Sequence, residues 1–165
     1  MKKKYFILLI LFIIVVFIIF YVINTANSEP VCDQTLWEHI YHPARLIIIK
    51  DCTEVKGTIR AVFKERDGDY HIRLQLDDKY KDLLNSVNIE KQHGDLVLEP
   101  ICQNSITQRN AVGPCKGFSK FISVPRVGTH VTVTGSYVLD TEHGWTEIHP
   151  VTKIKTGWFD VFGIG

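Results

Sequence analysis

The sequence lacks the short motifs that identify common enzyme and cofactor sites. None of its 11 glycines falls in a G-x-G-x-x-G or P-loop pattern, which excludes the usual dinucleotide and phosphate cradles. No G-x-S-x-G stretch is present, so a nucleophile elbow is not expected. No N-x-[ST] sequon occurs either, so N-glycosylation is not expected. We therefore predict no catalytic residue and favour a role other than an enzyme.

The chain also has little net charge. It carries 19 Lys and Arg against 18 Asp and Glu, and without Lys2–Lys4 the balance is 16 against 18. Binding to nucleic acid relies on a clustered basic surface that neutralises phosphates. A nucleic-acid partner is therefore not expected.

One long apolar run, Tyr5–Ile23, follows Lys2–Lys4. As a helix the run rises about 28 Å, close to the ~30 Å hydrocarbon core of a bilayer. Lysines ahead of such a run favour a cytoplasmic N-terminus. We expect a single-pass cell-membrane protein with a cytoplasmic stub (1–4), a transmembrane helix (5–23) and an extracytoplasmic remainder. The membrane is then a partner of the chain through this helix. A cleaved secretory signal is the alternative, and it exports the same remainder.

All four cysteines, Cys32, Cys52, Cys102 and Cys115, lie in the exported part. An even number in an oxidising compartment favours two disulfides. Three pairings are possible, and Cys32–Cys52 with Cys102–Cys115 is the most economical because each pair brackets one irregular segment. No two cysteines have C-x-x-C spacing, which disfavours zinc ligation by cysteine.

A period-two alternation of apolar residues predicts strands after the cysteine-bearing segment. Residues 24–52 are expected to form a tether and an N-terminal extension, 53–153 a β domain, and 154–165 an apolar tail. Asp67-Gly68 predicts a hairpin turn, and Gly135 predicts a bend within a strand. The five expected strands cover residues 53–64, 70–77, 95–102, 128–139 and 145–154.

This arrangement of short strands, with a break between the third and the fourth, resembles the OB-fold. The resemblance covers roughly residues 54–153. The stretch PRVGTHVTVTGSYVLDTEHGWTEIHP is also similar to small exported OB-like domains of bacteria and archaea that have no known function. The resemblance implies a mainly β fold, a five-stranded OB-like barrel with short helices. The apolar run adds one N-terminal transmembrane helix before the barrel. The resemblance carries over no functional residue.

Hydrogen-bonding side chains on the second expected strand form the first candidate site. OB barrels that bind polymers use strands two and three with their flanking loops. The outward face of strand two offers His71, Arg73 and Gln75. We predict a binding or interaction module whose partner is an extracytoplasmic protein, a glycan or a small ligand.

The stretch HGWTEIHP forms the second candidate site. Glu147 and His149 share one face of a strand with Trp145, and His143 lies in the turn before it. Imidazole and carboxylate at this spacing can bind a divalent metal or act as an acid–base pair. The alternative hypothesis is a metal-dependent site, enzymatic or metal-handling, built on Glu147 and His149 with another histidine, His71 or His143. Otherwise these side chains pack and hydrogen-bond locally, and no cofactor is required.

Overall fold

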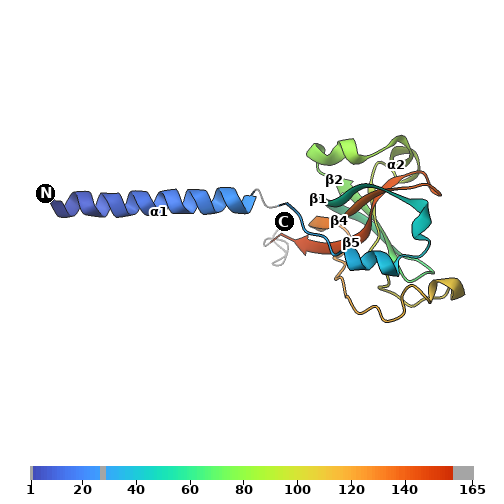
Figure 1. The fold of residues 1–165 in the computed structure, drawn as a ribbon. Helices are drawn as coiled ribbons and strands as arrows, with labels where there is room; N and C mark the ends of the chain where they lie inside the picture. The colour runs from blue at the N-terminus through green and yellow to red at the C-terminus, as the bar shows by residue number, and fades with distance from the viewer. Residues whose placement is uncertain (1, 27–28, 158–165) are drawn as a thin grey trace. The chain divides into compact units, whose positions relative to one another are not determined.

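A computed structural model of the chain describes residues 2–26 and 29–157 (Figure 1). The chain divides between Pro30 and Val31 into two compact units. The first unit contains one helix, α1 (Lys2–Ala26). The predicted apolar tail lies outside the described residues from Trp158 onward.

The predicted transmembrane helix at residues 5–23 is wrong. Within the described part of the chain, no helix combines the length and the apolar character that a membrane crossing requires. The predicted fold class is corrected accordingly.

The second unit is built on one mixed sheet of five strands. The hydrogen-bonded order is β1-β2-β3-β5-β4, and β4 also pairs with β1, so the sheet closes on itself. Neighbouring strands are antiparallel except β3 and β5, which are parallel. The number of strands agrees with the prediction, while the OB resemblance stays a prediction. The strands are β1 (Leu46–Lys64), β2 (Tyr70–Leu76), β3 (Leu96–Leu98), β4 (His130–Asp140) and β5 (Thr146–Thr156).

The main core follows from the period-two pattern of the strands. On β2 the side chains of Ile72, Leu74 and Leu76 are buried, as the alternation predicts. The predicted bend at Gly135 is confirmed, because the register between β4 and β5 shifts there. A Cβ at Gly135 would collide with the Ile148 side chain, so only glycine fits this close approach.

Short helical segments and two disulfides complete the unit. The structure joins Cys32 to Cys52 and Cys102 to Cys115, which confirms the most economical of the three pairings. The second bridge closes the start of the long loop between β3 and β4, drawn in yellow and orange in Figure 1. The helical segments are η1 (Gln34–His39), η2 (Pro43–Arg45), η3 (Asp78–Leu83), α2 (Ser86–Lys91) and η4 (Arg109–Ala111).

Candidate functional site

The parallel pairing of β3 with β5 brings two distant carboxylates and a histidine together. Leu98 is the register partner of Ile148. One residue further on, the Glu99 N–H donates to the Ile148 carbonyl at 2.9 Å, and the Val151 N–H donates to the Glu99 carbonyl at 3.1 Å. The backbone ladder therefore continues through Glu99 and places it beside His149.

His149 is the centre of a buried charge network. Its Nδ1 atom hydrogen-bonds to Glu147 Oε1 at 2.9 Å and lies 3.1 Å from Glu99 Oε2. The exposed fractions of His149, Glu147 and Glu99 are 1%, 0% and 7%. The Trp145 indole N–H donates to the other oxygen of Glu147 at 2.8 Å. Glu147 is thus fixed from both sides, by an imidazole and by an indole.

Glu99 also faces two further basic groups. His71 Nδ1 lies 3.5 Å from Glu99 Oε1, and Arg45 Nη2 lies 3.9 Å from Glu99 Oε2. Arg45 is anchored from its other side by Asp140, whose Oδ2 atom lies 3.3 Å from Arg45 Nε. One buried carboxylate is therefore surrounded by an arginine and two histidines.

The electrostatics of this network favour an ion pair. Burial alone would lower the pKa of His149, but the charge of Glu99 and the hydrogen bond to Glu147 outweigh it and raise that pKa to about 10. Burial would likewise raise the pKa of Glu99, yet His149 and His71 hold it below the usual carboxyl range. Burial, followed by the nearby charge of Glu99, raises the pKa of Glu147. We therefore assign the ion pair to His149 and Glu99.

A pocket of about 540 Å³ opens above this network. Arg45, His71 and Glu99 line it, together with Trp145 and Phe63. The imidazole edge of His71 meets the Trp145 ring at a centroid distance of 5.8 Å. The pocket thus combines aromatic faces with charged groups that converge on one wall, as ligand sites do.

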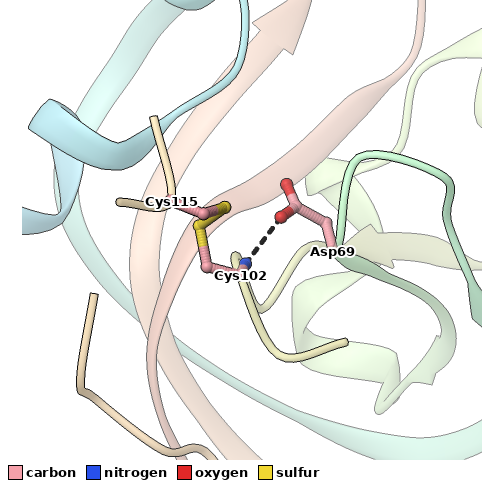
Figure 2. Close-up of side chains that lie close together, drawn as sticks. All are labelled: Asp69, Cys102 and Cys115. Atoms are coloured by element: carbon pink, nitrogen blue, oxygen red, sulfur yellow. Dashed lines mark hydrogen bonds between the residues drawn. A yellow bond between two sulfur atoms is a disulfide. The ribbon is translucent and has the colours of Figure 1, made fainter. Parts of the chain in front are cut away.

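Asp69 is a further buried carboxyl, placed between the Asp67-Gly68 turn and the second disulfide. Its Oδ1 atom accepts the Cys102 N–H at 2.6 Å (Figure 2). Its exposed fraction is 3%, and this burial raises its pKa to about 7. Asp69 also lies near both sulfur atoms, but Cys102 and Cys115 are bonded to each other and offer no thiolate to a metal.

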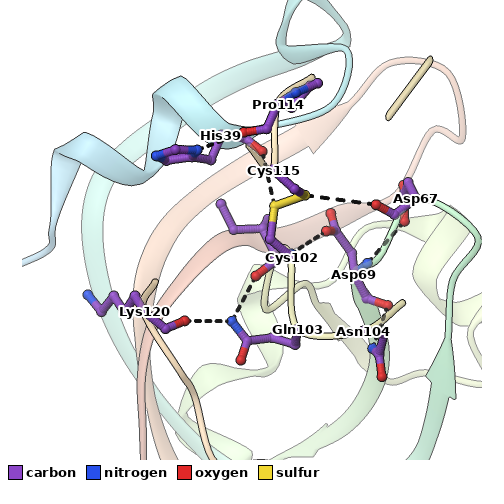
Figure 3. The surroundings of a disulfide bond; sticks show 10 residues. His39, Asp67, Asp69, Cys102, Gln103, Asn104, Pro114, Cys115 and Lys120 are labelled. Carbon is purple, nitrogen blue, oxygen red and sulfur yellow. Dashed lines mark hydrogen bonds between the residues drawn. A yellow bond between two sulfur atoms is a disulfide. The ribbon is translucent and has the colours of Figure 1, made fainter. Parts of the chain in front are cut away.

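The loop around this bridge is held by side-chain-to-backbone hydrogen bonds (Figure 3). The Gln103 amide donates to the carbonyls of Ile101 and Lys120, at 2.8 and 2.9 Å. The Asn104 amide donates to the Asp69 carbonyl at 3.2 Å. Asn104 and Cys102 of this loop therefore hold both the backbone and the side chain of Asp69.

The three residues of the first candidate site do not converge. His71 lines the pocket. The Arg73 side chain instead turns to Asp95, with 3.9 Å between Nε and Oδ2, and Gln75 is exposed. Only His71 of the predicted strand-two face belongs to the pocket.

The second candidate site is brought together in part. Glu147 and His149 are in contact, as the period-two spacing predicted. His143 stacks on Trp145 with ring centroids 4.4 Å apart, and its Nδ1 atom lies 2.8 Å from Asp140 Oδ2. It is therefore a wall residue of the pocket and not a neighbour of the His149 imidazole.

Sequence reasoning missed Glu99, Asp69 and Arg45. Glu99 had a usable signal, because it is a charged residue within the apolar stretch DLVLEPIC. Asp69 directly follows the predicted Asp67-Gly68 turn, and nothing local to it indicates that its carboxyl is buried. Arg45 precedes a long strand, and nothing local to it indicates that its guanidinium reaches Glu99.

Comparison with protein-family models and with curated proteins finds no match for this chain. The function is therefore argued from the chemistry of the site. That chemistry is a buried imidazole–carboxylate pair, a second carboxyl at Asp69, and an open pocket with aromatic walls.

Proposed function

We propose that this chain is an extracytoplasmic OB-like binding domain that takes a small polar ligand in the pocket above Glu99 and His149. Two disulfides fit an oxidising, extracellular setting. The strand order of the closed five-stranded sheet supports the OB-like part of the proposal.

The observation that carries this proposal is the convergence of charged groups at the pocket. Arg45, His71 and Glu99 all line it, and Glu99 connects it to the buried His149. Burying such a network costs free energy unless its charges are compensated, and hydrophobic residues in its place are often as stable or more so. Ligand recognition gives a reason to retain it, because pockets of this size use a few convergent polar groups for specificity.

The charge of the pocket favours a ligand with a positively charged group. The lining contains four carboxylates against one arginine, Arg45, and three histidines, His42, His71 and His143. The aromatic face of Trp145 can stack on a cation. We therefore expect amines to bind better than carboxylates of similar size. The carboxylates of the lining are Glu65, Asp67, Glu99 and Glu142.

The test is a nuclear magnetic resonance screen of the full chain against small amines, amino acids, sugars and carboxylates, observed at the Trp145 indole. We expect amines to shift this signal in a saturable way. Phe63→Ala is the informative variant, because Phe63 lines the pocket but is 51% exposed, so its loss should weaken binding without harming the core. Phe121→Ala, at an 81% exposed residue outside the pocket lining, is the control. Ligands that bind without moving the Trp145 signal, or a preference for carboxylates, would contradict the proposal.

A further inference from the structure

Two carboxyls and one imidazole meet beneath the pocket. Asp69, Glu99 and His149 each offer one ligand atom, and these three atoms lie within 4.8 Å of one another. Their exposed fractions are 3%, 7% and 1%. Three ionisable groups are rarely buried together unless they are paired or bind an ion. His149 can compensate one of the carboxylates, which leaves the other without a cation of its own inside the trio.

A second observation concerns the histidine of this trio. His149 Nδ1 is used by Glu147, whereas its Nε2 atom is buried and has no hydrogen-bond partner among the described residues. Buried polar atoms are normally paired. Asp69 also interacts electrostatically with His149. The free nitrogen therefore belongs to a ring whose other nitrogen already faces two carboxylates.

Glu147 stands where a metal-binding histidine needs support. Such a histidine usually donates its other ring N–H to a carboxylate, which fixes the tautomer and the ring orientation. Glu147 accepts from Nδ1 at 2.9 Å and is itself held by the Trp145 indole at 2.8 Å. The ring of His149 is thus oriented in advance, with Nε2 left for an ion.

We propose that Asp69, Glu99 and His149 bind one divalent transition-metal ion, such as zinc or manganese, with His149 Nε2 as the nitrogen ligand. Carboxylate and imidazole donors together suit these ions, whereas calcium and magnesium prefer oxygen ligands alone. Ligand atoms about 2.0–2.2 Å from an ion are at most ~4.4 Å apart. Glu99 Oε2 lies 3.1 Å from His149 Nδ1, so the Glu99 carboxylate has to move from the Nδ1 edge of the ring toward Nε2 when the ion binds. The ion takes the place of a proton on Nε2, and that proton leaves to solvent.

This site differs from the metal site that the sequence suggested. Glu147 orients the histidine and is not itself a ligand, and His143 belongs to the pocket wall. Glu99 is shared, because it both lines the pocket and belongs to the trio. The inference goes beyond the proposed function: the pocket can bind an amine whether or not an ion is bound beneath it.

The experiment is isothermal titration of the full chain, with its disulfides intact, with manganese chloride and separately with zinc chloride. We expect one ion per chain. Asp69→Asn and His149→Gln should weaken binding by at least about tenfold. His143→Gln, which removes a histidine nearby in the pocket wall, should leave the affinity unchanged. No saturable binding of either ion, or undiminished binding by Asp69→Asn, would overturn the proposal.

A second readout needs no variant and so does not depend on whether His149→Gln folds. Bound manganese broadens nuclear magnetic resonance signals close to it. We expect the strongest broadening at the backbone amides of Asp69, Glu99 and His149 in the wild-type chain. Broadening centred on His143 or on the exposed His130 would overturn the proposal, while amine binding observed at Trp145 would still stand.

Discussion

Replacing Asp69 by Asn should stabilise the folded chain at neutral and alkaline pH when a chelator is present. Burial raises the pKa of Asp69 from an ordinary 3.8 to about 7. Ionising this carboxyl in the folded state therefore costs about 4 kcal/mol more than in the unfolded chain. Asn has a similar shape, and its carbonyl oxygen can still accept the Cys102 N–H that Asp69 accepts at 2.6 Å.

The sign of the pH effect follows from proton binding. Between about pH 4 and pH 7 the folded state holds a proton on Asp69 that the unfolded state has released, so stability falls as the pH rises. Asn does not titrate, so the difference between variant and wild type should grow over this range. The new amide N–H₂ group needs a partner, and leaving it without one costs about 1–3 kcal/mol. We therefore expect a net gain of about 1–3 kcal/mol above about pH 7.

Urea unfolding at a series of pH values measures this difference. The control is Asp82→Asn, which makes the same chemical change at an exposed residue and should follow the wild type. Taking the difference between variant and wild type isolates Asp69 from other titrating groups. An Asp69→Asn protein that is less stable than wild type at every pH would refute the reasoning.

The remaining predictions concern the histidine, a glycine and a disulfide. The pKa of His149 is raised to about 10. The stability that the charged His149 contributes is therefore fully present below about pH 6.5 and is lost as the pH rises through about 10. In urea unfolding at a series of pH values, His149→Gln should lack this alkaline loss of stability. Gly135→Ala should lower the free energy of unfolding by about 1–3 kcal/mol through overpacking, whereas Gly113→Ala, with no atom within 4 Å of the new Cβ, should change it little in the same assay. Thiol titration of the native chain should find no free cysteine, and replacing Cys102 and Cys115 by Ser should cost about 3 kcal/mol in chemical denaturation. Reactive thiols in the native chain would contradict the disulfide prediction. A Gly135→Ala protein with the stability of the wild type would contradict the packing argument. A His149→Gln protein that still loses stability at alkaline pH would contradict the argument about His149.

Local pattern was enough to locate the five strands and the turn between the first two, but not all their ends. β1 begins at Leu46 and not at 53, and β3 covers only Leu96–Leu98 of the expected 95–102. Alternation on β2 places Ile72 and Leu74 in the core, and Gly68 takes the positive φ that its turn requires. The disulfide pairing also followed from sequence spacing. Each of these features depends on residues close together in the chain.

The candidate site was predicted only where it is local. Glu147 and His149 lie on one strand, so their contact follows from a period of two. Glu99 reaches His149 through parallel pairing of β3 with β5, a long-range contact that no spacing along the chain reveals. Asp69 belongs to a turn in sequence but is covered by the loop that carries Cys102, and that burial depends on the folded loop.

The central claim is that His149 is a buried cation between Glu99 and Glu147. The protonation state of its ring tests this claim most directly. The measurement is the ¹⁵N chemical shift of both ring nitrogens against pH, in the wild-type chain with a chelator present. The account predicts that both nitrogens remain protonated through neutral pH and titrate only near pH 10. Titration near the ordinary value of about 6.5, or a neutral ring at neutral pH, would contradict it.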